Sequence, residues 1–384
     1  MKVKNSMSRR LMVLQFSYLA ALSGFMNYLT LYLYEAGLSE MQIGVIYALS
    51  APATLVIQPL VGQVLDRWQN FRSLSVAGLA VFTLGIAAIP MPSLMPLVRL
   101  GLIFVVYALS KQFGGVFDLW TYRLQSEYPG VEYGKSRGVG SIGVGVATLV
   151  MGYFIEWWGF GAMFTVTVAL LMVVIGASLS LPDPSAAPGE DPKQQKSDFS
   201  LMKGPIFWYI LSFLVLKISV TLIGTFSSIL VDRLGGSSAT FGVTILLCAV
   251  TEVFVFTDWG RRCPEMTPRK AYLLCVATVF AGSIWTSLAP NIPLFLVGRI
   301  LLTIAYAMYT VFNLEFIRAS VPEAARGRVF LTLAALSTGV SFTVSSLLGG
   351  VILEIGSPVS MAVLTGAVTA AAFALHFRAF PKAA

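Results

Sequence analysis

Long apolar stretches recur along the chain at a length that matches the thickness of a lipid bilayer. The hydrocarbon core of a bilayer takes about 20 residues of α-helix, so apolar runs of this length indicate helices that cross it. The sequence predicts twelve such spans, at residues 11–34, 43–65, 73–92, 95–117, 139–158, 161–181, 205–231, 240–258, 271–289, 292–315, 328–353 and 358–377. The pattern therefore predicts an all-α integral membrane protein.

The composition supports a membrane protein. Of the 384 residues, 57% are hydrophobic and only 11% are charged, whereas about 25% of residues are charged in soluble domains. The net charge of +8 raises the question of nucleic-acid binding, but the basic residues follow the connections between spans. We therefore expect the lipid bilayer, and no nucleic acid, as the surroundings of this chain.

The charges of the connections alternate in sign from one side of the predicted membrane to the other. Most Lys and Arg residues lie before span 1, between the halves, at the C-terminus, and in the connections after spans 2, 4, 8 and 10. The opposite connections hold one basic residue, Arg233, among the acids Glu35, Glu40, Glu156, Asp232 and Glu354. By the positive-inside rule, both termini are predicted to be cytoplasmic, with the protein in the cytoplasmic (inner) membrane of the cell.

A linker divides the spans into two sets of six. Residues 182–204, PDPSAAPGEDPKQQKSDFSLMKG, are rich in proline and charge, as is typical of a flexible connection. The expected organisation is therefore a half at 1–181, the linker at 182–204, and a second half at 205–384. A weak echo favours duplication: VFTDWGRR (255–262) resembles VLDRWQNFR (64–72), and Gly152-x-x-x-Glu156 resembles Gly350-x-x-x-Glu354.

Ionisable side chains within the apolar spans or close to their ends carry the functional signal. A charge at the centre of a membrane helix costs roughly 2.5–3.5 kcal/mol on insertion scales unless it is paired or hydrated, so such residues mark function. The candidates are Lys111, Asp118 and Arg137 in the first half, and Lys217, Glu252, Arg299 and Glu315 in the second.

The end of span 2 resembles the loop signature of the major facilitator superfamily. The segment GQVLDRWQNFR (62–72) has the expected glycine, then Asp66, Arg67 and Arg72, although Gln69 stands where glycine is usual. The resemblance implies a gating role for these three charged residues. Physically, Asp66 can accept hydrogen bonds from a helix N-terminus, and Arg67 can bridge to acids. The alternative is a solvated turn.

A second resemblance rests on Asp118 at the end of span 4, the basic turn YGKSR (133–137) and the glycine-rich fifth span. These residues resemble a branch of the same superfamily, which holds lactose permease-like oligosaccharide:proton symporters, nucleoside:proton symporters and phenylpropionate permeases. The resemblance implies two six-helix halves with the site between them, no cofactor and a monomer. It also implies that Asp118 and Arg137 form a pair that binds solute. The alternative is a structural salt bridge.

The resemblance assigns the other candidates less directly. It implies a proton-coupling role for Glu252, where the alternative is a structural pair with Lys217, and for Arg299. Glu315 is either a third proton-coupling residue or a cytoplasmic gate partner of Arg318 or Arg123. Galactoside specificity is not expected, because Val144 stands where galactoside permeases have a stacking tryptophan, and span 10 has no histidine.

Two further groups complete the candidates. Asn27 and Tyr28 lie midway along span 1, where polar side chains line a cavity or join helices by hydrogen bonds. Lys111 and Lys217 are included with them as solute-binding candidates. The one histidine, His376, ends span 12 and is predicted to be a tail residue, and the three cysteines imply no disulfide framework.

These observations favour a proton-coupled secondary transporter, a symporter that carries a small polar or weakly acidic organic solute by alternating access. The alternatives are proton-driven efflux of sugars or amphiphilic drugs, and a non-transporting membrane receptor or scaffold. An enzyme is not expected, because the sequence has no metal-ligand spacing, no serine–histidine constellation and no complete phosphate-binding loop. The expected partners are the solute, protons and lipid, with no metal.

Overall fold

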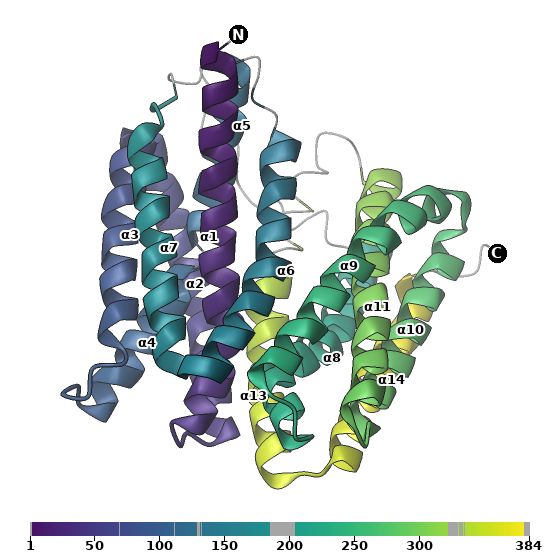
Figure 1. Cartoon of the computed structure of the whole chain (residues 1–384). Helices are drawn as coiled ribbons and strands as arrows, with labels where there is room; N and C mark the ends of the chain where they lie inside the picture. The colour runs from purple at the N-terminus through teal and green to yellow at the C-terminus, as the bar shows by residue number, and fades with distance from the viewer. Residues whose placement is uncertain are drawn as a thin grey trace. The chain divides into compact units, whose positions relative to one another are not determined.

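The computed structural model describes residues 2–68, 70–110, 112–128, 131, 133–184, 204–321, 329, 333 and 335–379 (Figure 1). Within these residues all regular structure is helical, and none is strand. The predicted linker falls largely on residues 185–203, which lie outside the described part of the chain.

The helices follow the predicted spans in order. In the first half they are α1 (Lys2–Glu35), α2 (Glu40–Trp68), α3 (Phe71–Ala88), α4 (Pro96–Ser110), α5 (Gln112–Glu127), α6 (Tyr133–Trp158) and α7 (Phe160–Ser180). In the second they are α8 (Pro205–Arg233), α9 (Ser238–Arg262), the short η3 (Cys263–Glu265), α10 (Pro268–Leu288), α11 (Ile292–Ser320), the π-helical η4 (Ser337–Ser341), α13 (Phe342–Ile355) and α14 (Pro358–Ala379).

Many of these helices are suited to a bilayer. Among the described residues, nine helical segments are long and apolar enough to cross a membrane. They correspond to α3, α4 with α5, α6, α7, α8, α9, α10, α11 and α14. The other three predicted spans correspond to α1, which buries several polar side chains, to α2, and to α13 with its flanking residues, which is short.

The described chain forms two compact units whose limits cut through two helices. Unit 1 comprises Met1–Glu35, Leu49–Glu190 and Ser237–Leu246, and unit 2 comprises Ala36–Ala48, Asp191–Gly236 and Leu247–Ala384. The start of α2 therefore belongs to unit 2, and the start of α9 belongs to unit 1. Each unit is held together by helix packing of its own.

Small residues set the packing of unit 1, where α1 lies against α6 and α7 (Figure 1). A Cβ atom built at Gly140 would lie 3.2 Å from the Gln15 carbonyl oxygen, and one at Gly143 would lie 3.0 Å from that of Phe16. Glycine lets the two backbones approach this closely. Gly138, in the same helix, has open space instead.

Aromatic side chains fill the core of unit 2, between α8, α10, α11 and α14. The ring of Tyr272 lies 5.5 Å from that of Phe312 and is stacked on His376, also at 5.5 Å. His376 is fully buried, so the prediction of a tail residue is wrong. Its ring packs between helices because α14 turns that face towards α10.

The three cysteines, Cys248, Cys263 and Cys275, are free and buried. None of them forms a disulfide.

Two junctions repeat within the chain. The same number of residues separates Gly44 from Gly242, Gly152 from Gly350, and Glu156 from Glu354. In unit 1, Gly152 of α6 packs against the backbone of α9 at Ser238 and Ala239. In unit 2, Gly350 of α13 packs against the backbone of α2 at Glu40 and Met41. The weak sequence echo thus corresponds to repeated helix packing.

The repeated helices begin in the same way. At the start of α2, Ser39 and Gln42 exchange hydrogen bonds between side chain and backbone. At the start of α9, Ser237 and Thr240 do the same. Such reciprocal capping satisfies N–H groups that have no partner within the helix.

Candidate functional site

Asp118 of α5 and Arg137 of α6 lie together in unit 1. Arg137 Nε is 3.7 Å from Asp118 Oδ1, and the Gln15 side-chain amide donates a hydrogen bond to the same oxygen at 3.2 Å. The close approach of α6 to α1 at Gly140 brings Gln15 within reach. The Arg137 and Asp118 side chains are 41% and 34% exposed. A loose, accessible pair of this kind can exchange its internal contact for hydrogen bonds to a polar solute.

Asn27 and Tyr28, the other candidates on α1, have protein partners. The Asn27 amide donates to the Thr148 hydroxyl at 2.9 Å. The Tyr28 hydroxyl lies 2.8 Å from the Thr148 carbonyl oxygen and 3.0 Å from that of Ser238, and Tyr28 is fully buried. These contacts join α1 to α6 and to the start of α9, within unit 1. They match the helix-joining alternative for both residues.

Lys217 lies in α8, and its ammonium donates a hydrogen bond to the Ser337 hydroxyl at 2.8 Å. Ser337 opens the π-helical turn η4. The described residues contain no ion pair between Lys217 and Glu252, so the structure does not provide the structural pair considered from the sequence.

Glu252 and Arg299 are separate features of unit 2. Glu252 is half-buried on α9, and no hydrogen bond or ion pair is found for it within the described chain. Tyr309 on α11 has a buried hydroxyl with no hydrogen-bond partner among the described residues. Arg299 lies near the start of α11. Its Nε atom is buried and has no hydrogen-bond partner among the described residues. The structure does not join these candidates into one cluster.

The candidate gating residues are only partly described. The side chains of Asp66 and Arg67, and the whole of Lys111, lie outside the described residues. The Arg72 guanidinium donates two hydrogen bonds to the Leu181 carbonyl oxygen, at 2.6 and 2.9 Å, and so caps the end of α7. Glu315 lies 3.6 Å from Arg318 on its own helix.

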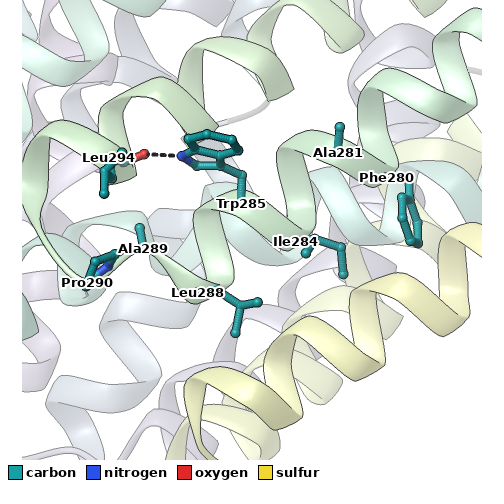
Figure 2. Close-up of a pocket in the computed structure, with 8 residues that line it drawn as sticks. All are labelled: Phe280, Ala281, Ile284, Trp285, Leu288, Ala289, Pro290 and Leu294. Carbon is teal, nitrogen blue, oxygen red and sulfur yellow. Dashed lines mark hydrogen bonds between the residues drawn. The ribbon is translucent and has the colours of Figure 1, made fainter.

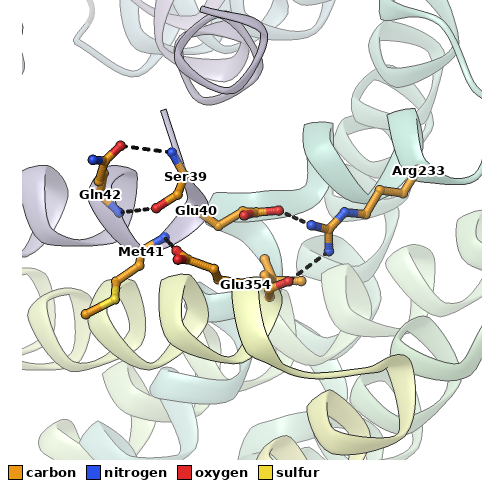
Figure 3. Close-up of polar contacts among 7 residues, drawn as sticks. Ser39, Glu40, Met41, Gln42, Arg233 and Glu354 are labelled. Carbon is orange, nitrogen blue, oxygen red and sulfur yellow. Dashed lines mark hydrogen bonds and ion pairs between the residues drawn. The ribbon is translucent and has the colours of Figure 1, made fainter. Parts of the chain in front are cut away.

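Figure 3 shows a polar cluster in unit 2 that we did not predict. Arg233, at the end of α8, pairs with the Glu40 carboxylate at the start of α2 and donates to the Leu353 carbonyl oxygen at 3.1 Å. The Glu354 carboxylate accepts the Met41 backbone N–H at 2.9 Å. The sequence held a signal for this cluster, because Arg233 is the one base among the acids on its predicted side.

The Glu354 carboxylate is stabilised in its charged form. Glu354 lies one residue beyond the predicted span. Hydrogen bonds from the Ser39 hydroxyl and the Met41 backbone N–H hold the pKa of Glu354 below its ordinary value, because they favour the ionised state.

A cavity of about 440 Å³ lies between α10 and α11 in unit 2 (Figure 2). Its lining is apolar and includes Phe280, Ile284, Trp285 and Leu288. The Trp285 indole donates to the Leu294 carbonyl oxygen at 3.0 Å. Polar solutes are oriented by a few precisely placed polar groups, and this lining is almost entirely apolar, with its one indole N–H already bonded to a carbonyl oxygen. We therefore do not take this cavity as the candidate site.

Comparisons with known proteins agree with this arrangement. A model of the MFS_1 like family matches residues 8–362. Maltose permease of Geobacillus stearothermophilus is 25% identical over 328 residues, which cover 83% of this chain and 81% of that protein. Among solved structures, one of the nucleoside transporter NupG has a TM-score of 0.79 at 15% identity, covering 97% of this chain and 97% of NupG.

A bacterial homologue of the human lysosomal transporter Spinster has a TM-score of 0.67 at 13% identity, covering 98% of this chain and 96% of the homologue. The structural likenesses show the fold. The predicted all-α membrane fold is confirmed, as is the resemblance to oligosaccharide and nucleoside permeases.

Proposed function

Because the chain belongs to the MFS_1 like family, a family of multi-pass membrane transporters, we propose that it is a proton-coupled symporter of a small polar or weakly acidic organic solute. The similarity to a maltose permease and to a nucleoside transporter, both named for polar solutes, supports this solute class. The protein works as a monomer in the cytoplasmic membrane, with both termini in the cytoplasm and with no catalytic activity of its own.

One observation carries the proposal: the accessible Asp118–Arg137 pair, with Gln15 on the same carboxylate oxygen. An acid, a base and an amide side by side offer both donors and acceptors to a solute. The pair is loose, so a solute can displace it without leaving either charge buried. In this proposal Asp118 and Arg137 bind the solute.

Glu252 takes the proton. It is an acid within a predicted membrane helix, it is half-buried, and its carboxylate has no protein cation beside it in the described chain. A carboxyl group in such surroundings is suited to alternate between protonated and ionised forms. Alternating access then requires that residues 1–181 and 205–384 move relative to one another, with 182–204 as the connection and with Asp66, Arg67 and Arg72 in the gate.

The test is solute flux into proteoliposomes, with and without an inward proton gradient. Sugars, nucleosides and aromatic carboxylates are added in turn, while the luminal pH, the membrane current and the solute content are recorded. We expect one class to accumulate with the gradient and to acidify the lumen. Solute flux that does not depend on the proton gradient would contradict proton coupling. Transport only in the outward direction of the cell, seen as uptake by inverted vesicles alone, would indicate efflux.

Two substitutions separate the assigned roles. Glu252→Gln should abolish accumulation driven by the proton gradient but leave exchange of solute measurable, whereas the exposed Glu265→Gln should change neither. Arg137→Lys should weaken solute binding by about tenfold, because a charge-assisted hydrogen bond contributes about 1.5–3 kcal/mol and lysine cannot reproduce the planar fork. Unchanged gradient-driven uptake by Glu252→Gln would remove Glu252 from the mechanism.

A further inference from the structure

Lys217 is a cation well inside a membrane helix. It lies in α8, within the apolar segment Ile206–Arg233. At 1.5 Å per residue, it is about 18 Å along the axis from Pro205 and about 24 Å from Arg233. A lysine side chain cannot extend its ammonium to the membrane surface over either distance. The charge therefore has to be accommodated within unit 2.

The described residues do not neutralise this charge. The ammonium of Lys217 has three N–H donors. One donates to the Ser337 hydroxyl, and the described chain contains no carboxylate that pairs with Lys217. Its helix neighbours Phe213 and Leu216 are buried and apolar. A charge in such surroundings calls for a counter-charge, and the described residues do not contain one beside Lys217.

The partner of Lys217 is held in place by an irregular turn. Ser337 and Ser341 open and close the π-helical turn η4, and single π-helical turns often occur at functional sites. The Ser341 hydroxyl donates to the Leu214 carbonyl oxygen at 2.9 Å. Leu214 precedes Lys217 by one helical turn on the same face of α8. Two hydroxyls of η4 are thus fixed against that face, one of them on the ammonium.

The first half has no equivalent of this arrangement among the described residues. The same number of residues separates Gly143 from Ser341 as separates Leu19 from Lys217. At these counterpart positions, Gly143 packs against the Phe16 carbonyl oxygen and the Leu19 side chain packs on Gly140. Where unit 1 has apolar packing, unit 2 has an ammonium and a hydroxyl. The duplicated scaffold therefore does not require Lys217.

We propose that Lys217, with the Ser337 hydroxyl, binds an anionic group of the transported solute, a carboxylate or a phosphate. The proposal rests on the transport function proposed above and narrows its substrate class to organic anions. The ammonium supplies the charge and its two remaining N–H donors, and Ser337 orients it.

The test compares ligands that are matched in shape but differ in charge. The purified full chain in lipid nanodiscs is titrated with phenylpropionate and phenylpropionamide, with uridine monophosphate and uridine, and with glucose 6-phosphate and glucose. Ligand-dependent thermal stabilisation gives each Kd. In at least one pair, we expect the anion to bind about tenfold or more tightly than its neutral partner. The carboxylate and phosphate pairs show which anion is preferred.

The variants assign that preference to Lys217. Lys217→Gln should bind both members of the pair alike, Lys217→Arg should retain most of the preference, and Ser337→Ala should lose part of it. The exposed Lys270→Gln, outside the predicted spans, should behave as the wild type. If Lys217→Gln does not fold, Lys217→Arg and Ser337→Ala still test the proposal. An equal preference for the anion in the wild type and in these two variants would contradict it.

Other outcomes also give a decision. An equal affinity for anion and neutral partner in the wild type would overturn the proposal. The proposal would also be overturned if only inorganic phosphate or anionic lipid stabilised the protein, if Lys217→Gln lost this stabilisation, and if no anion bound better than its neutral partner. The site would then bind a headgroup. Gradient-driven uptake of the neutral member alone would leave the proposed symport standing without the anion site. Anion binding without any flux would support the anion site and contradict the proposed symport.

Discussion

The two repeated junctions have the same backbone packing but are held together by different interactions. In unit 1, the start of α9 packs on α6, with Gly152 and Gly242 at the points of closest approach. In unit 2, the start of α2 packs on α13, with Gly350 and Gly44 in the same roles. A neutral Tyr28 hydroxyl completes the first junction, and the Arg233 ion pair completes the second.

The counterparts show how the difference arose. Glu35 and Ser238 occupy the positions that correspond to Arg233 and Glu40, so unit 1 has neither the base nor its acid. Phe226, the counterpart of Tyr28, packs its ring near Gly349 and has no hydroxyl. The glycines preserve the geometry, and the charged residues can change without disturbing it. One junction is therefore ionic and the other is not.

The largest effect should come from Arg233→Met. The Glu40 side chain is 7% exposed, so the substitution leaves a buried carboxylate unpaired. Breaking a buried pair costs about 3–5 kcal/mol, and we expect the lower end because Arg233 is itself 38% exposed. Thermal unfolding of the purified protein measures the loss.

Arg262→Met is the matched control for Arg233→Met. Arg262 pairs with Asp258 at 2.9 Å on the surface of α9, where the side chains are 69% and 58% exposed. Exposed pairs contribute about 0–1 kcal/mol. If both variants unfold at the same temperature, the junction of unit 2 does not depend on its ion pair.

The next largest effect should come from the glycines at which the helices of both junctions approach closely. Gly152→Ala and Gly350→Ala should each destabilise the protein by about 1–3 kcal/mol, the usual cost of overpacking. The added Cβ would meet the Ser238 carbonyl oxygen in one case and lie 2.6 Å from the Glu40 carbonyl oxygen in the other. Neither backbone can move aside cheaply. Unfolding in mild detergent compares the two losses.

Gly138→Ala is the control for these substitutions. It lies in α6 with open space around it, so alanine should be neutral or stabilise the helix by up to about 1 kcal/mol. A loss confined to one junction would show that the glycines do not play equal parts.

A smaller effect is expected for Tyr28→Phe. Removing the hydroxyl deletes the hydrogen bond of the neutral junction, at a cost of about 1 kcal/mol. Because no charge is involved, this cost should not change between low and high salt. The cost of Arg233→Met should shrink modestly at 1 M salt, because Arg233 is 38% exposed and can be screened, whereas the buried Glu40 is screened little. If the cost of Tyr28→Phe also changed with salt, the two junctions would not differ in the way proposed.

The smallest effect should come from Glu354→Gln, and it should depend on pH. The pKa of Glu354 is lowered by the Ser39 hydroxyl and the Met41 N–H. A carboxyl group with a lowered pKa in the folded state stabilises that state above its ordinary pKa and loses this contribution as the pH falls through the lowered value. Wild type and variant should therefore differ at pH 7 and converge in acid. A constant difference would exclude the carboxylate as its source.

The sequence predicted the fold well because apolar runs of membrane length have one physical explanation. The all-α membrane fold could be predicted without knowing any contact between side chains. The boundaries were less accurate, since span 4 comprises α4 and α5. His376 was misassigned because proximity to a chain end says nothing about the face on which a helix is buried.

The candidate site was predictable only where the resemblance supplied both partners, as it did for Asp118 and Arg137. The pairing of Lys217 with Ser337 could not be predicted, because 120 residues separate them and a hydroxyl carries no charge pattern. Arg233 and Glu40 are 193 residues apart, yet the lone base among acids was a usable signal. Asn27 and Tyr28 looked suited to a cavity because polarity alone does not distinguish a solute from a neighbouring helix.

Because Cys248, Cys263 and Cys275 are buried, the native protein should react little with the thiol-specific labels used in spectroscopy. Thiol-reactive probes attach to exposed thiolates, and buried thiols react slowly. Cysteines introduced at exposed positions, such as Met41 on α2 and Ile355 on α13, can therefore be spin-labelled in the presence of all three native residues. The distance between those two labels would report the ionic junction directly, and its distribution with and without solute would show whether that junction opens during turnover.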